Sequence, residues 1–442
     1  MTMTSNDVHA TLKKHILAEG YDFVCDLEKS HGCYLYDSKG KREFLDMFSF
    51  FASLPVGFNH PKISNPTFIT KLGKTAINKV SNPDVYTVEF AETVDAFGRY
   101  AIPKELPHLF LIDSGTLAIE NALKVAFDWK VKKNFARGSK DEKGRQVIHF
   151  KNAFHGRSGY TLSLTNTADP RKYQYFPRFD WPRIDPPSLT FEGGKPNTAA
   201  AASLEERALE QIHSAIKKNP DDIAALLIEP IQAEGGDNHF RAEFLKELRT
   251  LCDQHEIMLI FDEVQTGFGL TGKFWAYEHF HVVPDALAFG KKSQVCGILV
   301  GRRVDEIEKN VFVEQSRINS TFGGNLVDMV RVAKILEIIH TEKLIQHAAT
   351  VGKHLLSRLV ELERESDITN ARGLGLMCAI DFPSPETRDQ VRKKCYEKGM
   401  IILACGTRSL RFRPTLTVTT KEIDKAIDIL RETLKTENLF IS

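Results

Sequence analysis

Short apolar runs that end abruptly in charged residues recur along this chain. Residues 257–261 form such a run and are followed by Asp262, and residues 286–289 form another, followed after one glycine by Lys291. An apolar run of about five residues is typical of a parallel strand that is buried on both faces. Ligands of open α/β sheets bind at the carboxyl ends of such strands. The pattern therefore predicts a carboxylate and an amine at the same edge of a sheet.

The remaining periodicity predicts helices and strands in alternation, which is typical of an α/β fold. Short strands are expected around a turn between residues 23 and 44, and an alternating tail follows two helices near the C-terminus, so we expect a small β-rich N-terminal lobe and a separate C-terminal lobe. Helices are predicted at residues 6–19, 61–79, 87–100, 117–132, 203–218, 242–255, 325–341, 344–363, 386–398 and 421–434, and further strands at 109–112, 147–150, 223–228, 297–300, 376–380, 400–403 and 409–412.

The composition argues against several classes of protein. The 442 residues carry a formal net charge of +1 and contain no basic run, which argues against nucleic-acid binding. The N-terminus lacks an apolar segment and no stretch approaches the length of a membrane span, so we expect no membrane contact and a cytoplasmic location. The seven cysteines are scattered and show no metal-ligand spacing, so we expect reduced thiols and no metal site.

Asp262 and Lys291 are the pair of groups that pyridoxal phosphate requires. A lysine at a strand end can be desolvated, which makes its amine less protonated and able to form a Schiff base with an aldehyde. An aspartate beside the pyridine nitrogen keeps that nitrogen protonated, so that the ring can accept electrons. From these two residues alone, an ordinary strand with a solvated acidic pair and surface lysines is the stronger interpretation.

Two other strand ends could complete a cofactor site. Residues 113–116 join a strand to a helix N-terminus through small hydroxyl residues, an arrangement that binds anions such as phosphate. Serine and threonine also cap helices that bind nothing. In the loop at residues 153–160, Phe154 could stack on a planar cofactor while Arg157 reaches a carboxylate. Equally, Phe154 could belong to the core and Arg157 could be a surface charge.

In this order, the pieces resemble the class III, or omega, aminotransferases among the fold type I pyridoxal-phosphate enzymes. The resemblance covers essentially the whole chain, and six motifs match in identity, order and spacing. They are Ser-Gly-Thr at residues 114–116, Phe-His-Gly-Arg at 154–157, Glu-Pro-Ile at 229–231, Asp-Glu-Val-Gln-Thr-Gly at 262–267, Gly-Lys at 290–291 and Arg-Phe-Arg-Pro at 411–414.

The resemblance implies an α/β fold in two domains. The large domain, residues 61–325, would hold pyridoxal 5'-phosphate on a mostly parallel central sheet sandwiched by helices. The small α+β domain would be built from an N-terminal segment, residues 1–60, and a C-terminal segment, residues 326–442.

The resemblance also implies how the cofactor is held. Lys291 binds it covalently and later moves a proton, and Asp262 pairs with its ring nitrogen. Val264 and Phe154 cover the two faces of the ring, and Gln265 contacts the ring hydroxyl.

The phosphate of the cofactor implies a second subunit. By resemblance, Gly115 and Thr116 hold this phosphate, helped by Thr321 from the other copy of the chain. The expected protein is therefore a homodimer with shared active sites.

The substrates follow from a narrower resemblance to the lysine-specific subgroup of the family. Residues 154–166, 289–297 and 319–325 carry it. It implies transfer of the ε-amino group of L-lysine to 2-oxoglutarate, which gives L-glutamate and L-2-aminoadipate 6-semialdehyde, a product that cyclises to piperideine-6-carboxylate.

The substrate contacts implied by resemblance centre on two arginines. Arg157 binds the distal carboxylate in both half-reactions, and Arg411 binds the α-carboxylate of the diacid. When lysine is bound, Glu234 pairs with Arg411 and spares it from being an unpaired buried cation. Gln265 and Asn319 are expected as further substrate contacts.

Other functions stay open at this point. The same chemistry could act on ornithine, 4-aminobutyrate or another terminal amine, and a pyridoxal-phosphate-binding protein without turnover is an alternative of a different class. A dinucleotide-binding oxidoreductase is disfavoured because no G-x-G-x-x-G turn follows a strand with an acidic residue at the expected distance.

Overall fold

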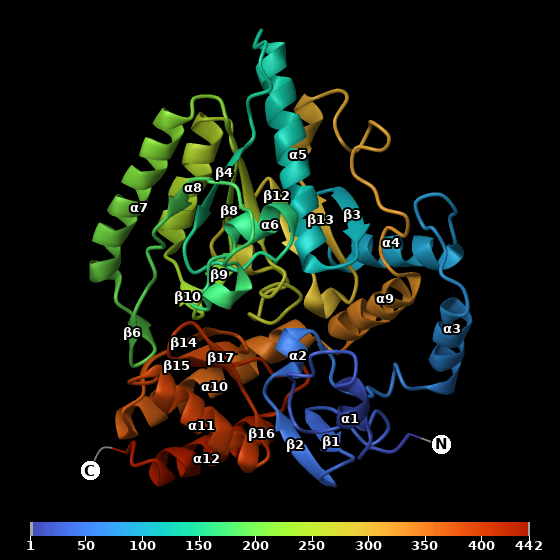
Figure 1. Ribbon diagram of the computed structural model, residues 1–442, viewed down its shortest axis with the longest axis vertical. Helices are drawn as coiled ribbons and strands as arrows, with labels where there is room; N and C mark the ends of the chain where they lie inside the picture. The colour runs from blue at the N-terminus through green and yellow to red at the C-terminus, as the bar shows by residue number, and fades with distance from the viewer. Residues whose placement is uncertain (1–2, 441–442) are drawn as a thin grey trace.

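The structure is a computed structural model that describes residues 3–440, and its largest element is a seven-stranded sheet (Figure 1). The strand order is β3, β13, β12, β11, β8, β4, β5, and only β13 runs antiparallel to its neighbours. The carboxyl ends of the other strands therefore meet at one edge. The strands are β3 (His108–Ile112), β4 (Gln146–Phe150), β5 (Arg183–Ile184), β8 (Ile223–Ile228), β11 (Met258–Asp262), β12 (Ala286–Phe289) and β13 (Cys296–Val300).

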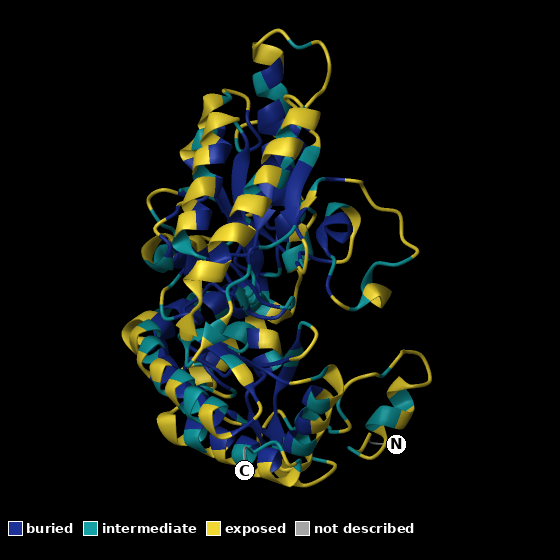
Figure 2. Cartoon of the chain, turned by 90° about the vertical axis from the view of Figure 1, so that its left-hand side faces the viewer, coloured by how far each residue is buried: buried dark blue, intermediate teal, exposed yellow. Residues whose placement is uncertain are grey.

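Helices cover both faces of this sheet, so its central strands are buried throughout. Met258 and Ile260 of β11 pack in the core below α5 (Gly115–Ala136). Leu259 and Phe261 point to the opposite core, which is covered by α4 (Val88–Tyr100), α7 (Thr198–Lys218) and α8 (Ala242–Gln254). Successive side chains of a strand point to opposite faces, which explains why an uninterrupted apolar run is needed here. Figure 2 shows the buried strands between helices whose outer sides are exposed.

A second lobe lies below the large sheet in the view of Figure 1. Its four-stranded antiparallel sheet has the order β14, β15, β18, β17, and α10, α11 and α12 pack on it or on one another. The elements are α10 (Leu344–Glu365), β14 (Thr369–Leu374), β15 (Met377–Asp381), α11 (Pro385–Glu397), β17 (Leu403–Cys405), β18 (Ser409–Phe412) and α12 (Thr420–Thr436).

The two ends of the chain meet in a small three-stranded sheet. β1 (Tyr34–Asp37) pairs with β2 (Arg42–Asp46), and β2 pairs in parallel with β16 (Met400–Ile401). N-terminal strands thus lie beside a C-terminal segment, as the blue and red ribbons of Figure 1 show. The domain limits at residues 60 and 325 stay a prediction, and residues 1–2 and 441–442 lie outside the described part of the chain.

The remaining elements are short or connect the lobes. α9 (Leu326–Thr341) packs against α4 and α3 (Pro66–Ala76). None of the helices within residues 3–440 has both the length and the apolar character that crossing a membrane requires. The other elements are α1 (Val8–Leu12), α2 (Ser49–Ala52), α6 (Gly159–Leu164), η1 (Pro170–Lys172), β6 (Phe191–Glu192), β7 (Lys195–Pro196), β9 (Ile231–Gln232), β10 (Asn238–His239), η2 (Ala276–His279), η3 (Lys291–Ser293) and η4 (Arg302–Glu306).

Several local predictions differ from the structure; the helices predicted at residues 61–79 and 203–218, for example, are α3 (Pro66–Ala76) and α7 (Thr198–Lys218). The helix predicted at residues 6–19 is shortened to α1. None of its side chains is buried, so packing does not stabilise a longer helix. The segment at residues 153–160 was predicted as a loop but leads into α6. This helix was not predicted because most of its residues are weak helix formers. The single strand expected at residues 400–403 is divided between β16 and β17, because its two halves pair with different sheets.

Candidate active site

A cavity of about 270 Å³ lies at the carboxyl edge of the large sheet. Its walls come from the turn between β3 and α5 and from the segments that follow β4, β8, β11 and β12. Eight of the residues expected in the site are among those that line it. The lining residues are Ser114, Gly115, Thr116, Phe154, His155, Gly156, Glu229, Glu234, Asp262, Val264, Gln265 and Lys291.

The backbone around this cavity is strained. Ser114 and Lys291 have positive φ angles of 76° and 53°, which non-glycine residues rarely adopt. Gly156 has a φ of 133°, and a side chain there would collide with the hydroxyls of Thr116 and Thr161. Strained residues of this kind persist where the surrounding structure holds them, and they concentrate at functional sites.

The carboxylate of Asp262 is fixed from two sides. Its Oδ1 accepts a hydrogen bond from the Val264 amide at 3.0 Å, and its Oδ2 lies 2.8 Å from Nδ1 of His155. The His155 side chain is fully buried. His155 therefore holds the orientation of the carboxylate, a contribution that the sequence analysis missed although this histidine stands between Phe154 and Arg157 in a matching motif.

The two adjacent lysines after β12 face in different directions. Lys291 lines the cavity, where burial lowers the pKa of its amine against the opposing effect of the Asp262 charge. Lys292 is buried elsewhere and donates to the carbonyl oxygen of Gln265 at 2.7 Å. Only Lys291 offers its amine to the cavity, at a lowered pKa that suits a nucleophile.

The turn before α5 presents unpaired donors to the cavity. Ser114 caps the helix, its hydroxyl accepting from the Leu117 amide at 3.4 Å, while Gly115 lies so close to Val264 that a Cβ would be 3.0 Å from a Val264 methyl group. The first amides of a helix have no partner within the helix and attract anions. A donor-rich turn, a buried carboxylate and an amine thus line one cavity, a set that fits the phosphate, ring nitrogen and aldehyde of the expected cofactor.

Arg411 contacts two residues that line the cavity, Glu234 and Gln265. Its Nη2 donates to Glu234 Oε2 at 2.6 Å and its Nη1 donates to Gln265 Oε1 at 3.3 Å. The arginine side chain is only 1% exposed. Its Nε is buried and has no hydrogen-bond partner within residues 3–440. One donor of this guanidinium is therefore free for another acceptor.

Gln265 is held by a second arginine that the sequence analysis left without a role. Arg413 Nε donates to Gln265 Oε1 at 2.9 Å, and the rest of its guanidinium forms a buried ion pair with Asp237. The amide oxygen of Gln265 thus accepts from Arg411 and Arg413 together. Its amide nitrogen is left to donate toward the cavity.

Glu229 is a further buried group that was not predicted to have a role. It accepts hydrogen bonds from the amides of Phe154 at 3.0 Å and Ala233 at 2.9 Å. Burial raises the pKa of its carboxyl to about 7, although the nearby His155 opposes this shift. Glu229 fixes the backbone of Phe154 and so sets where that ring lies.

Four predicted site residues do not line the cavity of their own chain: Arg411, which contacts the lining residues Glu234 and Gln265, and Arg157, Asn319 and Thr321. Arg157 follows the cavity wall in sequence, but its side chain is exposed. Asn319 lines a different hollow, beside Pro83. The carbonyl oxygen of Thr321 accepts from the hydroxyl of Ser81 at 2.6 Å, outside the cavity.

Comparison with known proteins identifies a family. The family model described as aminotransferase class III matches residues 16–434. The L-lysine-epsilon aminotransferase of Mycobacterium tuberculosis is 49% identical over 434 residues, with 98% of this chain and 96% of the relative covered. The mitochondrial 4-aminobutyrate aminotransferase of Homo sapiens is 32% identical, with 90% and 82% covered.

A solved structure shares the fold. The lysine aminotransferase from M. tuberculosis in the internal aldimine form superposes with a TM-score of 0.95 at 49% identity, covering 98% of this chain and all of that one. This similarity extends over both lobes, so the α/β architecture predicted from the sequence is confirmed.

Proposed function

Because this chain belongs to the class III aminotransferases, we propose that it moves the ε-amino group of L-lysine to 2-oxoglutarate. The products are L-glutamate and L-2-aminoadipate 6-semialdehyde, which cyclises to piperideine-6-carboxylate. Identity of 49% over nearly the whole chain to lysine-specific relatives supports this substrate over the other terminal amines.

Pyridoxal 5'-phosphate is the cofactor of this enzyme, as of its family. When bound, it supplies an electron-accepting ring and carries the amino group between the two substrates. We assign its phosphate to Gly115 and Thr116, its ring faces to Phe154 and Val264, and its hydroxyl to the amide nitrogen of Gln265.

Lys291 and Asp262 do the chemical work in this proposal. Lys291 Nζ is placed to hold the proton that leaves the substrate carbon bearing the amine, and would pass it on to the bound cofactor. Its lowered pKa suits this task, because a base must be unprotonated before it can accept a proton. Asp262 keeps the ring nitrogen protonated, and the hydrogen bond from His155 holds its carboxylate in position.

The ion pair between Glu234 and Arg411 is the observation that carries the choice of a terminal amine. When Glu234 neutralises Arg411, the site can accept a substrate end that has no carboxylate. When glutamate or 2-oxoglutarate binds instead, Glu234 moves away and Arg411 takes the α-carboxylate. The free Nε of Arg411 then gains an acceptor.

Arg157 and Asn319 complete the substrate site in this proposal. Arg157 binds the distal carboxylate in both half-reactions, and Asn319 is a further contact. Arg157 is exposed, so its guanidinium is available to a substrate carboxylate.

We propose a homodimer in which each site borrows Thr321 from the other copy. Thr321 lies outside the cavity of its own chain, and large apolar side chains such as Tyr86, Val88 and Tyr175 are more than two-thirds exposed. A dimer interface would bury side chains of this kind. Sedimentation of the holoenzyme as a single chain would contradict this proposal.

The cytoplasm stays the expected location. All seven cysteines are free thiols within the described structure. Thiols of this kind are typical of proteins in reducing compartments. Fractionation of the cells that make the protein would test this expectation directly.

The proposed function is tested by spectroscopy of the holoenzyme in two steps. L-lysine added without an acceptor should convert the cofactor to its amine form, and 2-oxoglutarate should then restore the starting spectrum. Trapping of the semialdehyde fixes the ε position. A holoenzyme that does not react with lysine but reacts with 4-aminobutyrate would overturn the choice of substrate. We name 4-aminobutyrate as the rival substrate because the human 4-aminobutyrate aminotransferase is 32% identical to this chain.

A further inference from the structure

The carboxylate of Glu234 binds two cations at once. Its Oε2 accepts from Arg411 Nη2 at 2.6 Å, and its Oε1 accepts from Lys172 Nζ at 2.8 Å. Arg411 belongs to β18 in the lower lobe, whereas Lys172 ends the short helix η1 in the segment that follows α6. Glu234 thus bridges two separate parts of the fold. Only the pairing with Arg411 was expected from the sequence.

Lys172 is held near the cavity independently of Glu234. Its Nζ lies 5.6 Å from the centre of the Phe154 ring, a distance at which an ammonium is attracted to the ring face. Its side chain is 16% exposed, and Glu234 is its only ion-pair partner in the described part of the chain. This contact with Phe154 does not involve Glu234, so it would keep the ammonium beside the cavity when the carboxylate shifts.

The charges around Glu234 indicate a role for Lys172. Burial raises the pKa of Glu234, but the charge of Arg411 and the hydrogen bond and charge of Lys172 outweigh burial and lower it, so Glu234 is ionised. Without Lys172, a substrate carboxylate that takes Arg411 would leave Glu234 as a partly buried anion with no partner. Leaving such a charge unpaired is costly.

We propose that Lys172 is the positioning residue that receives Glu234 whenever a diacid occupies Arg411. The inference rests on the proposed function, because it assumes that lysine and 2-oxoglutarate alternate in one site. In the diacid complex, Arg411 pairs with the substrate and Lys172 pairs with Glu234, so both pairs are neutral. In the lysine complex, Glu234 lies between both cations, as in this structure. The flexible stem of a lysine lets its point charge follow the moving carboxylate.

The test measures each half-reaction separately on the loaded enzyme by absorbance. Lys172→Met keeps the length of the side chain and removes its charge, which leaves Arg411 as the only partner of Glu234. We expect the half-saturating concentration of 2-oxoglutarate to rise about tenfold, as for a lost charge-assisted hydrogen bond. The value for lysine should stay within about twofold. Lys172→Arg should restore most of the loss.

The neighbouring arginine provides a matched control. Arg171 carries the same charge on the same segment, but it is exposed and pairs with Asp169. Arg171→Met should therefore leave both half-reactions unchanged. In a Glu234→Gln background, Lys172→Met should have no further effect on 2-oxoglutarate, because the two residues act through one interaction.

The possible outcomes separate this inference from the proposed function. Wild-type enzyme that fails to react with lysine overturns the proposed function. Wild-type enzyme that reacts with both substrates, combined with a Lys172→Met variant that shifts both half-reactions equally or neither, overturns the role of Lys172 alone. Loss of 2-oxoglutarate affinity that persists in the Glu234→Gln background also overturns it.

Discussion

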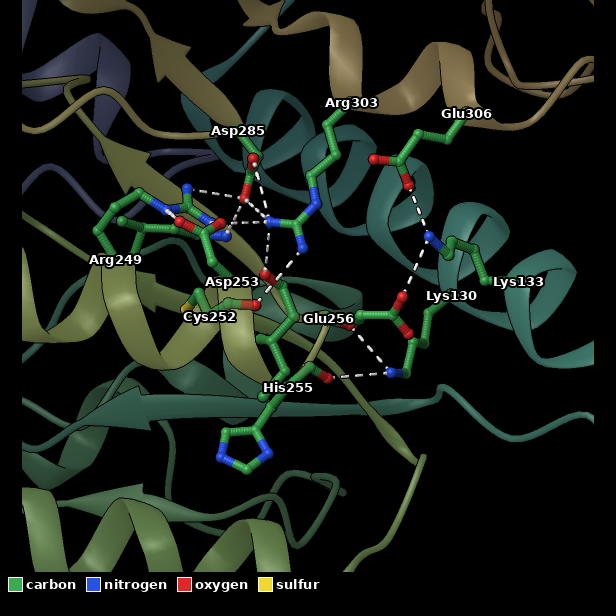
Figure 3. Close-up of polar contacts among 12 residues, drawn as sticks. Lys130, Lys133, Arg249, Cys252, Asp253, His255, Glu256, Asp285, Arg303 and Glu306 are labelled. Atoms are coloured by element: carbon green, nitrogen blue, oxygen red, sulfur yellow. Dashed lines mark hydrogen bonds and ion pairs between the residues drawn. The ribbon is translucent and has the colours of Figure 1, made fainter. Parts of the chain in front are cut away.

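The central strand β11 has a cluster of charged side chains at each of its two ends. Figure 3 shows the cluster at the amino end, where Asp285 contacts Arg249 at 2.9 Å and Arg303 at 3.2 Å and also accepts from the Leu259 amide at 2.7 Å. Lys130 in the same view donates to two backbone carbonyl oxygens.

The cluster at the carboxyl end is paired less completely. Arg411 keeps one buried donor without a partner within residues 3–440, Glu234 is shared between two cations, and Lys291 faces the cavity. Both clusters consist of the same residue types. The amino-end charges are satisfied by the protein itself, which is what stability requires, whereas the carboxyl-end charges keep binding capacity for a ligand.

The largest effect should come from Lys291. Lys291→Ala removes both the covalent link and the proton acceptor, so we expect transamination to fall by about 10⁴-fold or more. Lys292→Met is the control, because Lys292 does not line the cavity and donates to the backbone carbonyl oxygens of Gln265 and Ala52. Absorbance of the bound cofactor and single-turnover rates measure the difference. Retention of the lysine-linked absorbance in Lys291→Ala and its loss in Lys292→Met would reverse the assignment.

A pair of aspartate variants compares the two ends of β11 directly. Asp262→Asn should lower turnover by about a hundredfold or more, because the ring nitrogen loses its anionic partner. Asp285→Asn should leave turnover within about twofold and lower the free energy of unfolding by about 3 kcal/mol, since it breaks a buried ion pair. Steady-state kinetics and thermal unfolding measure both quantities. Similar losses of turnover in both variants would remove the distinction between the two ends.

Glu234 should affect one substrate more than the other. Glu234→Ala leaves Arg411 as a nearly buried cation without its partner when lysine is bound. We expect the lysine half-reaction to weaken about tenfold more than the glutamate half-reaction. Rapid-mixing measurements of each half-reaction give the two values, and equal losses would refute the movement of Glu234.

The smallest effect concerns pH and stability. Burial raises the pKa of the Glu263 carboxyl from 4.5 to about 7, against the hydrogen bonds it accepts from the amides of Ala276 and Tyr277. The folded protein then binds this proton more tightly than the unfolded chain. Its contribution to the free energy of unfolding therefore falls by about 3 kcal/mol as the pH rises from 4.5 to 7.

Glu263→Gln removes that titration without touching the cavity. The variant should lose less thermal stability than the wild type between pH 5 and pH 7.5, and its turnover should be unchanged. Thermal unfolding at the two pH values checks this. An unchanged pH dependence would show that Glu263 titrates at its ordinary pKa.

Much of the fold follows from local sequence. The apolar runs before Asp262 and Lys291 predicted β11 and β12 and the edge at which both groups lie, and the structure confirms both strands. Elements without an apolar face of their own were predicted poorly. The residues at 400–405 form two strands only because two different sheets are available to pair with them.

The sequence by itself determined which segments are buried, which groups stand at the strand ends and which family the motifs resemble. A strand's burial is evident in its own composition, since both of its faces must be apolar. Only the tertiary structure decided which partners the charged groups have. His155 binds Asp262 across 107 positions, Lys172 binds Glu234 across 62, and Arg413 binds Gln265 across 148. No local pattern records such pairs, because each exists only after distant segments have packed together.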